Sequence, residues 1–506
     1  MKAFLMEQDH DFDIQQELPS NAHALMQDLE LPTLFNAMAL GDEFLYDVAK
    51  KAVLSSVKND VNTILYRQHI LQDCLKNASI IREIYAIAVE SIENERKNYW
   101  GMFSKYPATI LHRSIEVLQM FVVMLKKLRQ IADEQADQFE SEGFQRFFSM
   151  LIQELSDEYF GIVQHHLKTL KFHDGMLISA ELGPGHKGIN YTLRKPHQLN
   201  QGWIKRIFAQ KPPEYSFSIH PRDESGARAL SELKDRGINL VANALARSAE
   251  HILSFFKMLR TELAFYIGCL NLYEQLAPMG ESLCFPQPVA AKERKHAVQG
   301  LYDVCLALTM QQKIVGNTVN ADNTNLVIIT GANQGGKSTF LRSIGLAQLM
   351  MQCGMFTPAK SFCANLCDSL FTHYKREEDA SMKSGKLDEE LSRMSTIVNH
   401  LTPNALMLFN ESFAATNERE GSEIGRQIVS ALLEKHLKVF FVTHLYEFAH
   451  GFYIRNMKNA LFLRAERYTD GTRTFQLVKG EPLSTSYGAD LYQKIFRTAA
   501  SPQTVS

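Results

Sequence analysis

The chain has 506 residues and a formal charge of −2, with 54 basic and 56 acidic side chains. This length allows several domains with ample cores, and the near-neutral charge excludes a uniformly basic nucleic-acid-binding protein, so any such site must be a local patch. The seven cysteines are odd in number and scattered, which is typical of a reducing compartment and not of a disulfide-stapled secreted domain.

The N-terminal sequence MKAFLMEQDHDFD lacks the basic start and apolar run of a signal peptide. The longest apolar stretch, near Val117–Leu125, contains Gln119 and is too short to span a bilayer. We therefore expect a cytoplasmic protein with no membrane partner. Acidic residues dominate residues 1–40, which we interpret as a partly ordered leader. The alternative is an acidic tail that binds a partner.

Residues 41–285 are expected to form a helical core and lever domain. Apolar residues recur at helical spacing in residues 80–92, and further helices are predicted over Ser114–Ile131 and Phe147–Leu170. A nearly continuous apolar seam then runs from Ala227 to Leu276. It predicts one long helix, with Gly237 as the place where a break would fall.

Glycine and proline interrupt residues 172–228, an irregular insert in which MLISAEL and YSFSIH predict hairpin strands. No acidic residue occurs between Leu182 and Pro213, where basic and aromatic residues are interleaved. Such a segment could bind the phosphate backbone of nucleic acid. The alternative is a solvated hairpin whose charges pair with acidic helices. The candidate DNA-contacting residues are Lys187, Arg194, Lys195, Lys205, Arg206 and Lys211.

Residues 286–506 are expected to form a P-loop ATPase domain. The stretch LVIITGANQGGKSTF, Leu326–Phe340, predicts a buried strand, a G-x-x-x-x-G-K-[ST] loop and an amphipathic helix to about Met351. Glycines let the backbone approach an anion, so that N–H groups and the helix N-terminus face phosphate oxygens. Lys337 should reach the β/γ-phosphates and Ser338 should bind Mg²⁺. The predicted nucleotide-binding residues are Gly331, Ala332, Asn333, Gln334, Gly335, Gly336, Lys337, Ser338 and Thr339.

Two later strands are expected to supply the remaining chemistry. ALMLF, Ala405–Phe409, ends in Asn410 and Glu411. We expect Asn410 to contact Mg²⁺ through water and Glu411 to polarise the attacking water. KVFFV, Lys438–Val442, leads to His444, which is expected to contact the γ-phosphate, although a lone histidine is more often structural. The predicted catalytic residues are Glu411, Lys337 and His444.

The segments TGANQGGKSTFLRSIGLAQLMMQCGMFTPA, NALMLFNESFAAT and FFVTHLYEFAH resemble the ATPase core of the MutS family of DNA mismatch-repair proteins. The likeness covers Leu301–Leu491, including a Ser-Tyr-Gly at 486–488, and ILYRQHILQDCL gives a weaker likeness over Gly41–Leu276. The resemblance implies an α/β P-loop NTPase domain of the ABC/MutS type, preceded by a mostly α-helical core and lever domain with a small β-containing insert. It also implies ATP and Mg²⁺ as cofactors and DNA as a partner.

The resemblance further implies a homodimer that pairs head to tail through its ATPase domains, with a signature segment of one subunit facing the P-loop of the other. The nearest candidates are Ser384 and Gly385, ahead of a helix N-terminus. The sequence of this segment departs from the family pattern. The alternative to a signature role is that Ser384 and Gly385 only cap the helix that follows.

Other departures from the family pattern bear on activity. Asn410 stands where the family has Asp, which removes a negative charge close to Mg²⁺ and predicts weaker metal binding or slower turnover. Few residues precede the helical scaffold, so the family's N-terminal mismatch-reading and connector domains are expected to be missing.

Together these features predict a MutS-like, ATP-dependent DNA-binding protein that hydrolyses ATP in DNA repair or mismatch-repair-type processing, with repair proteins as possible partners. One alternative is a nucleotide-gated DNA clamp or scaffold with negligible turnover. Another is an ABC-type ATPase that acts on protein.

Overall fold

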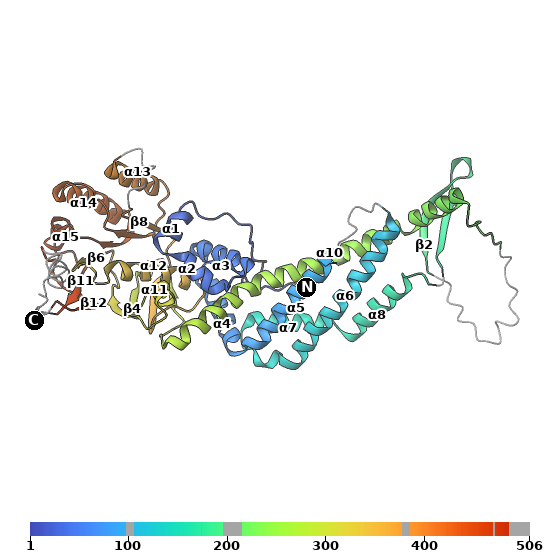
Figure 1. Cartoon of the computed structure of the whole chain (residues 1–506), viewed down its shortest axis with the longest axis horizontal. Coiled ribbons are helices and arrows are strands. Elements are labelled where there is room, and N and C mark those ends of the chain that lie inside the picture. The colour runs from blue at the N-terminus through green and yellow to red at the C-terminus, as the bar shows by residue number, and fades with distance from the viewer. Residues whose placement is uncertain (98–105, 174, 196–214, 377–384, 469–470, 485–506) are drawn as a thin grey trace, which may run out of the picture. The chain divides into compact units, whose positions relative to one another are not determined.

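The computed structural model describes residues 1–97, 106–173, 175–195, 215–376, 385–468 and 471–484 (Figure 1). Its contacts divide the chain into two compact units. Unit 1 comprises residues 1–3, 82–139 and 144–260, and unit 2 comprises residues 4–81, 140–143 and 261–506. In this division residues 4–81 pack with the ATPase half of the chain. The domain boundaries expected at residues 40 and 285 stay a prediction.

Unit 1 is built mainly from helices. Phe121 and Phe256 pack in its core with ring centroids 5.6 Å apart, and the side chains of both are buried. The chain bends at Leu155 and Ser156, so the single helix expected over Phe147–Leu170 is two helices. Ser156 caps the second one by accepting a hydrogen bond from the Tyr159 N–H. The helices are α5 (Ala78–Lys97), α6 (Pro107–Gln135), α7 (Glu142–Glu154), α8 (Asp157–Thr169) and the first part of α10 (Glu224–Leu276).

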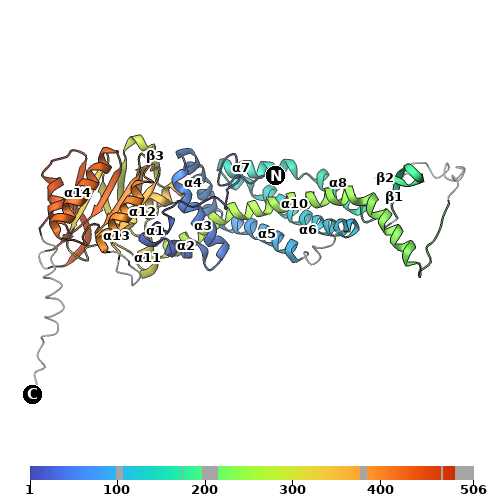
Figure 2. The ribbon, with the colours of Figure 1, turned by 90° about the horizontal axis from the view of Figure 1, so that it is seen from above.

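The long helix α10 runs without a break through Gly237, contrary to the expected interruption (Figure 2). A Cβ atom at Gly237 would lie 2.6 Å from the Ile178 side chain, so this glycine allows a strand to pack closely against the helix. A glycine inside a helix costs about 1 kcal/mol relative to alanine. The close packing of Ile178 can offset this cost. The expectation of a break was therefore wrong.

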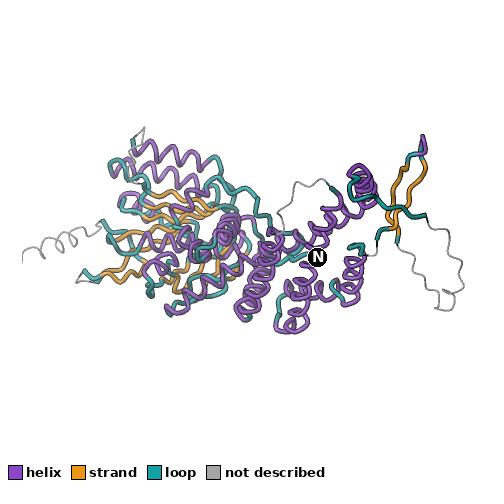
Figure 3. The backbone as a smooth tube through the Cα atoms, turned by 45° about the vertical axis from the view of Figure 1, so that its right-hand side comes forward, coloured by secondary structure: helices purple, strands orange, loops and turns teal. Residues whose placement is uncertain are grey.

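The strands described in unit 1 form one antiparallel hairpin, β1 (Leu177–Leu182) and β2 (Gly188–Arg194), drawn in orange in Figure 3. Leu177 pairs with Arg194 at its open end. The first predicted hairpin strand is thus confirmed. The second is wrong, because YSFSIH at residues 215–220 forms no strand and GINYTLR pairs instead.

Helix α6 is long and apolar enough to cross a membrane by length and composition. Half of its most apolar window is nevertheless buried inside the protein, as in the core helix of a bundle. Its spacing of apolar residues fits that packing.

Unit 2 contains a six-stranded sheet in the order β12-β11-β6-β10-β9-β8, in which only β12 is antiparallel to its neighbour. A second sheet has the order β3-β7-β4-β5. The strands of the first sheet are β6 (Leu326–Gly331), β8 (Leu370–Tyr374), β9 (Leu406–Asn410), β10 (Lys438–Val442), β11 (Ala460–Arg467) and β12 (Arg473–Lys479). Those of the second are β3 (Gln287–Val289), β4 (His296–Leu301), β5 (Asn317–Asn320) and β7 (Ser361–Asn365).

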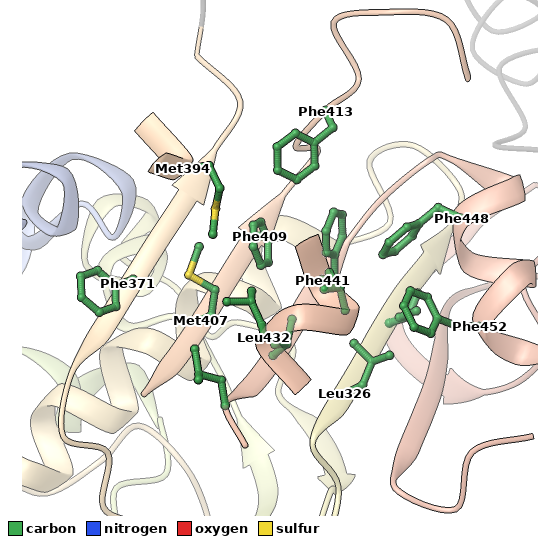
Figure 4. Packing of buried hydrophobic residues seen from close by; sticks show 14 of the residues in the cluster. Leu326, Phe371, Met394, Met407, Phe409, Phe413, Leu432, Phe441, Phe448 and Phe452 are labelled. Atoms are coloured by element: carbon green, nitrogen blue, oxygen red, sulfur yellow. The ribbon is translucent and has the colours of Figure 1, made fainter. Parts of the chain in front are cut away.

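Helices cover both faces of the six-stranded sheet (Figure 1). On one face Phe409, Phe441 and Phe448 stack in a buried cluster with side chains from α13 (Lys386–Val398), α14 (Glu418–Glu434) and α15 (Tyr446–Tyr453) (Figure 4). On the other face α12 (Lys337–Cys353) is almost wholly buried. Buried strands and helices on both faces are what a parallel sheet requires. The remaining helices of unit 2 are α1 (Ala22–Asp28), α2 (Leu31–Ala39), α3 (Glu43–Ser55), α4 (Val61–Lys76) and α11 (Val304–Met310).

The acidic N-terminal segment is folded against unit 2 and is not the partly ordered leader that its composition predicted. Leu5 and Met6 are fully buried. Their backbone is held by side chains from far along the chain: the Glu262 carboxylate accepts the Leu5 N–H at 2.6 Å and the Phe12 N–H at 3.2 Å, and the Arg67 Nε donates to the Met6 carbonyl. The composition of residues 1–40 predicted partial disorder because it carries no information on these partners, which lie far away in the sequence.

Glu262 makes this anchorage sensitive to pH. Burial raises the pKa of its carboxyl to about 7, although backbone N–H groups lower it. The folded state therefore binds more protons than the unfolded state between pH 4.5 and 7, and stability falls as pH rises through this window. We expect Glu262→Gln to remove this loss, which is at most on the order of 3 kcal/mol. Urea unfolding at pH 5, 6, 7 and 8 measures it.

The matched control is Glu274→Gln, on an exposed position of the same helix, which should keep the pH dependence of the unchanged protein. Equal slopes for all three proteins between pH 5 and 7 would show that Glu262 does not carry the effect.

Candidate active site

The candidate site lies at one edge of the six-stranded sheet, where three parallel strands end. Val442 of β10 is opposite Ile329 of β6 on one side and Asn410 of β9 on the other. The loop after β6, the Asn410–Glu411 pair and His444 therefore emerge side by side. Open α/β sheets bind ligands at this carboxyl edge.

The loop after β6 has the geometry of a phosphate cradle. Gly331 has φ = +107°, and a Cβ atom there would lie 2.8 Å from the Ala465 backbone nitrogen of β11, so glycine is required. The Arg473 Nε donates to the Asn333 carbonyl at 2.6 Å and fastens the loop to β12. Residues 331–339 thus form the loop and the first turn of α12, as predicted.

Lys337 is held over this loop. Its Nζ donates to the Gly331 carbonyl at 3.1 Å and to the Ala332 carbonyl at 3.0 Å, and the residue is only 5% exposed. Burial lowers the pKa of its ammonium group, the Glu411 charge raises this pKa, and Arg473 lowers it. The lysine therefore sits where its charge is costly to keep without an anion nearby.

The predicted metal-binding residues come together. The Ser338 hydroxyl donates to the Asn410 Oδ1 at 2.8 Å, across the gap between α12 and β9. A hydroxyl and an amide oxygen are hard donors of the kind that Mg²⁺ accepts, so the residues fit this ion. Beside them the Glu411 Oε1 lies 3.0 Å from the His444 Nε2, so two of the three predicted catalytic residues are in contact.

A cleft of about 340 Å³ opens beside the loop. Its walls are mixed: Gln334 and Thr339 come from the loop and α12, whereas Ile314, Val315 and Phe475 are apolar. An apolar cleft with a few polar groups suits a planar heteroaromatic ring.

Two family models match the chain: the MutS2 N-terminal domain over residues 59–279 and MutS domain V over residues 327–505. The chain belongs to the MutS family. The second match contains the loop, Asn410, Glu411 and His444, and the first spans α4 to the end of α10.

Curated MutS-family relatives match at modest identity. The chain is 27% identical over 278 residues to MutS protein homolog 4 of Mus musculus, which covers 53% of this chain and 27% of the relative. It is 29% identical over 310 residues to the DNA mismatch repair protein MutS of Bacillus subtilis (strain 168), covering 60% and 35% of the two chains. With the same-named protein of Streptococcus thermophilus (strain CNRZ 1066) it is 26% identical over 263 residues, covering 51% and 31%. The chain spans about a quarter to a third of the length of these relatives.

The structure describes one of the two candidate signature residues, Ser384 and Gly385. Gly385 is the residue before α13, with φ = −67° and ψ = 156°, and no side chain caps the helix there. Ser384 lies outside the described residues. A role for this segment across a dimer stays a prediction.

The candidate DNA contacts are also partly described. Lys187, Arg194 and Lys195 are exposed on or beside the β1–β2 hairpin, and the Arg194 Nε donates to the Ser179 hydroxyl at 2.8 Å. Lys205, Arg206 and Lys211 lie outside the described residues, as do Ser-Tyr-Gly 486–488. Nothing in the hairpin geometry tests DNA contact.

A buried polar network behind Glu411 escaped the sequence reasoning. Ser412 follows Glu411, and its hydroxyl lies 2.8 Å from the His373 Nδ1. The His373 Nε2 faces the Glu390 carbonyl at 3.0 Å, and the Glu390 Oε2 accepts the Phe413 N–H at 2.8 Å. The network therefore joins the turn after β9 to α13. A polar pair, Thr-His, inside the apolar strand β8 was the only signal.

Burial lowers the pKa of His373 to about 4, so the ring is neutral near pH 7. Its Nε2 must carry the proton because it faces a carbonyl, so Nδ1 can only accept. The Ser412 hydroxyl donates to the His373 carbonyl at 2.5 Å and lies within hydrogen-bond distance of this Nδ1 as well, so two acceptors share its one proton. Glu411 has φ = +55°, a strained conformation for a non-glycine residue that its surroundings must hold in place. His373, Ser412 and Glu390 supply that support.

The first prediction for this site concerns Asn410. Asn410→Asp introduces a negative charge within hydrogen-bond distance of Ser338. The gross attraction of this charge to the two positive charges of Mg²⁺ at about 4 Å, with an effective dielectric constant of about 20, is on the order of 8 kcal/mol before hydration offsets most of it. We expect the Mg²⁺ concentration for half-maximal ATP hydrolysis to fall about tenfold. A magnesium titration of both proteins measures this. An unchanged midpoint and rate would refute the metal role of Asn410.

The second prediction concerns Ser412. Ser412→Ala removes a buried hydrogen bond worth about 1 kcal/mol, which should lower kcat about three- to tenfold with little change in nucleotide affinity, because Glu411 loses its support. Ser412→Thr keeps the hydroxyl and should recover most of the rate. Steady-state kinetics and calorimetry separate kcat from affinity.

Ser56→Ala is the matched control, because Ser56 is another fully buried serine of unit 2 and its hydroxyl donates to the Val53 carbonyl at 2.7 Å. If both alanine variants lost the same activity, general destabilisation and not the positioning of Glu411 would explain the loss.

Proposed function

We propose that this MutS-family chain binds and hydrolyses ATP with Mg²⁺ and couples the nucleotide state to binding of DNA. The observation that carries the ATPase proposal is the convergence at one sheet edge. Ser338 is hydrogen-bonded to Asn410, and Glu411 is in contact with His444 beside them. A phosphate loop, a metal-binding pair and a general base are the parts that phosphoryl transfer to water needs.

Each side chain has a distinct role in this proposal. Lys337 neutralises the β/γ-phosphates, because its ammonium is already fixed against the loop. Ser338 and Asn410 would hold Mg²⁺, which when bound would supply positive charge to the phosphate oxygens. Glu411 accepts a proton from the attacking water, and His444 orients the Glu411 carboxylate through the 3.0 Å contact.

The cleft beside the loop would take the nucleobase. Phe475 and Val315 offer apolar walls, and the Gln334 side chain offers an amide group for the ring edge. Gly336 lines this cleft and precedes α12, so in this assignment the base would lie next to the phosphate loop.

The proposal of DNA binding rests on the names of the relatives, and that of dimerisation on the family resemblance of the sequence. The matched proteins of Bacillus subtilis and Streptococcus thermophilus are named DNA mismatch repair proteins. We extend DNA binding, and pairing of two copies through the ATPase domains, to this chain. The exposed cations of the β1–β2 hairpin, Lys187 and Lys195 among them, would meet phosphate groups.

A second candidate is a nucleotide-gated DNA clamp with negligible turnover. Asn410 favours it, because an amide in place of a carboxylate contributes no charge to the metal. In that case ATP binding would drive dimerisation and the binding of DNA without release of phosphate.

A phosphate-release assay with and without duplex DNA tests the proposal. Glu411→Gln should lower turnover by about 10²- to 10⁴-fold while nucleotide binding persists, since only the general base is lost. Lys337→Ala should weaken nucleotide binding itself. Exposed Glu434→Gln and Lys435→Ala, on and beside the end of α14, are the controls and should leave both quantities unchanged.

The outcomes separate the candidates. ATP-dependent dimerisation with no phosphate release favours the clamp. A folded protein that takes up no ATP in calorimetry, with Mg²⁺ present, would falsify both.

A further inference from the structure

A basic cleft lies between α6 and α8 in unit 1, with a volume of about 750 Å³. Four lysines and a histidine line it, together with three glutamines, and no acidic side chain does. The cationic residues are Lys126, Lys127, Lys168, Lys171 and His173. A concave surface with one sign of charge focuses the field of its cations on whatever enters it.

Within the described part of the chain, three of these lysines have no carboxylate partner. Lys127 pairs with Glu90 at 3.2 Å. Lys126, Lys168 and Lys171 are exposed and form no ion pair, and the Lys126 ammonium lies 5.3 Å from the Phe160 ring centroid. Their charges are therefore available to a ligand.

A neighbouring cleft of unit 1 shows the contrast. It has a similar volume of about 780 Å³, but Glu95 and Glu250 line it beside its basic residues, and Arg113 pairs with Glu95 at 3.2 Å. Its charges are balanced within the protein. The unbalanced positive charge is therefore a feature of the α6–α8 cleft and is not shared by the neighbouring cleft of unit 1.

The lining residues also form a track along α6. Gln119, Val123, Lys126 and Gln130 recur at helical spacing, so they share one face over about 16 Å. This length matches about five nucleotides of one DNA strand at 3.4 Å each. Apolar Val123, which is 53% exposed, gives the floor a surface for sugar rings.

We propose that the α6–α8 cleft binds the phosphodiester backbone of nucleic acid through Lys126, Lys168 and Lys171. The inference rests on the proposed DNA binding and adds a second phosphate-binding surface to the hairpin. A backbone fits better than a free phosphate ion, because the cleft is lined along about 16 Å of α6 and its volume of about 750 Å³ exceeds that of one ion.

The test is the salt dependence of DNA binding by the full chain. Fluorescence anisotropy with a labelled duplex and a labelled single strand, between 50 and 200 mM NaCl, compares the unchanged protein with the triple variant Lys126→Gln, Lys168→Gln, Lys171→Gln. Loss of three phosphate contacts should reduce the slope of log affinity against log salt by about 2.7 for duplex, so the loss of affinity across this range shrinks about 40-fold.

The matched control neutralises three exposed lysines of unit 2, Lys292→Gln, Lys435→Gln and Lys458→Gln, and should keep the original slope. All six side chains are exposed, so both variants should fold, which circular dichroism checks.

Each outcome decides the proposal. A reduced slope in the cleft variant alone supports it. Equal slopes in both variants, with DNA binding intact, overturn the cleft and leave the proposed function standing. No DNA binding by the unchanged protein overturns both.

Discussion

Parallel hydrogen bonding of β6 to β10, and of β10 to β9, is the constraint on which the candidate site depends. It aligns Ile329, Val442 and Asn410, so the residues that follow each strand leave the sheet at one edge. A parallel sheet needs both faces covered, and the stacked phenylalanines on one side and buried α12 on the other provide this. The apolar packing thereby fixes polar groups that come from positions far apart in the sequence.

Behind that edge, the polar contacts are buried and matched. His373 is neutral, its Nε2 donates to the Glu390 carbonyl, and the Ser412 hydroxyl contacts both its Nδ1 and its backbone carbonyl. Such a network costs little when every member is paired and is expensive when one is not. It links the turn that carries Glu411 to α13, the helix that begins after Gly385. A change in the position of α13 would therefore reach Glu411 through two hydrogen-bonded steps.

The N-terminal segment illustrates how charge composition can mislead. Its acidic residues suggested a solvated leader, yet Glu7 pairs with Arg67, and Glu262 holds the backbone at Leu5 and Phe12. The hydrogen bonds and apolar burial of this segment outweigh the cost of its dense acidic charge. The partners, Arg67 and Glu262, lie on two other helices. No local pattern contains that information.

Sequence alone determined the strand–loop–helix of residues 326–353, the two later strands that end in Asn410 and Val442, and membership of the MutS family, because these rest on local apolar runs, glycine spacing and short motifs. It also gave the long helix α10. Only the tertiary structure decided that α10 passes through Gly237, that GINYTLR and not YSFSIH pairs with β1, and that His373 and Glu390 support Ser412. It alone brought together the lysines of the α6–α8 cleft. The reason is that contacts between distant segments depend on packing, whereas the periodicity of a sequence reports only its neighbours.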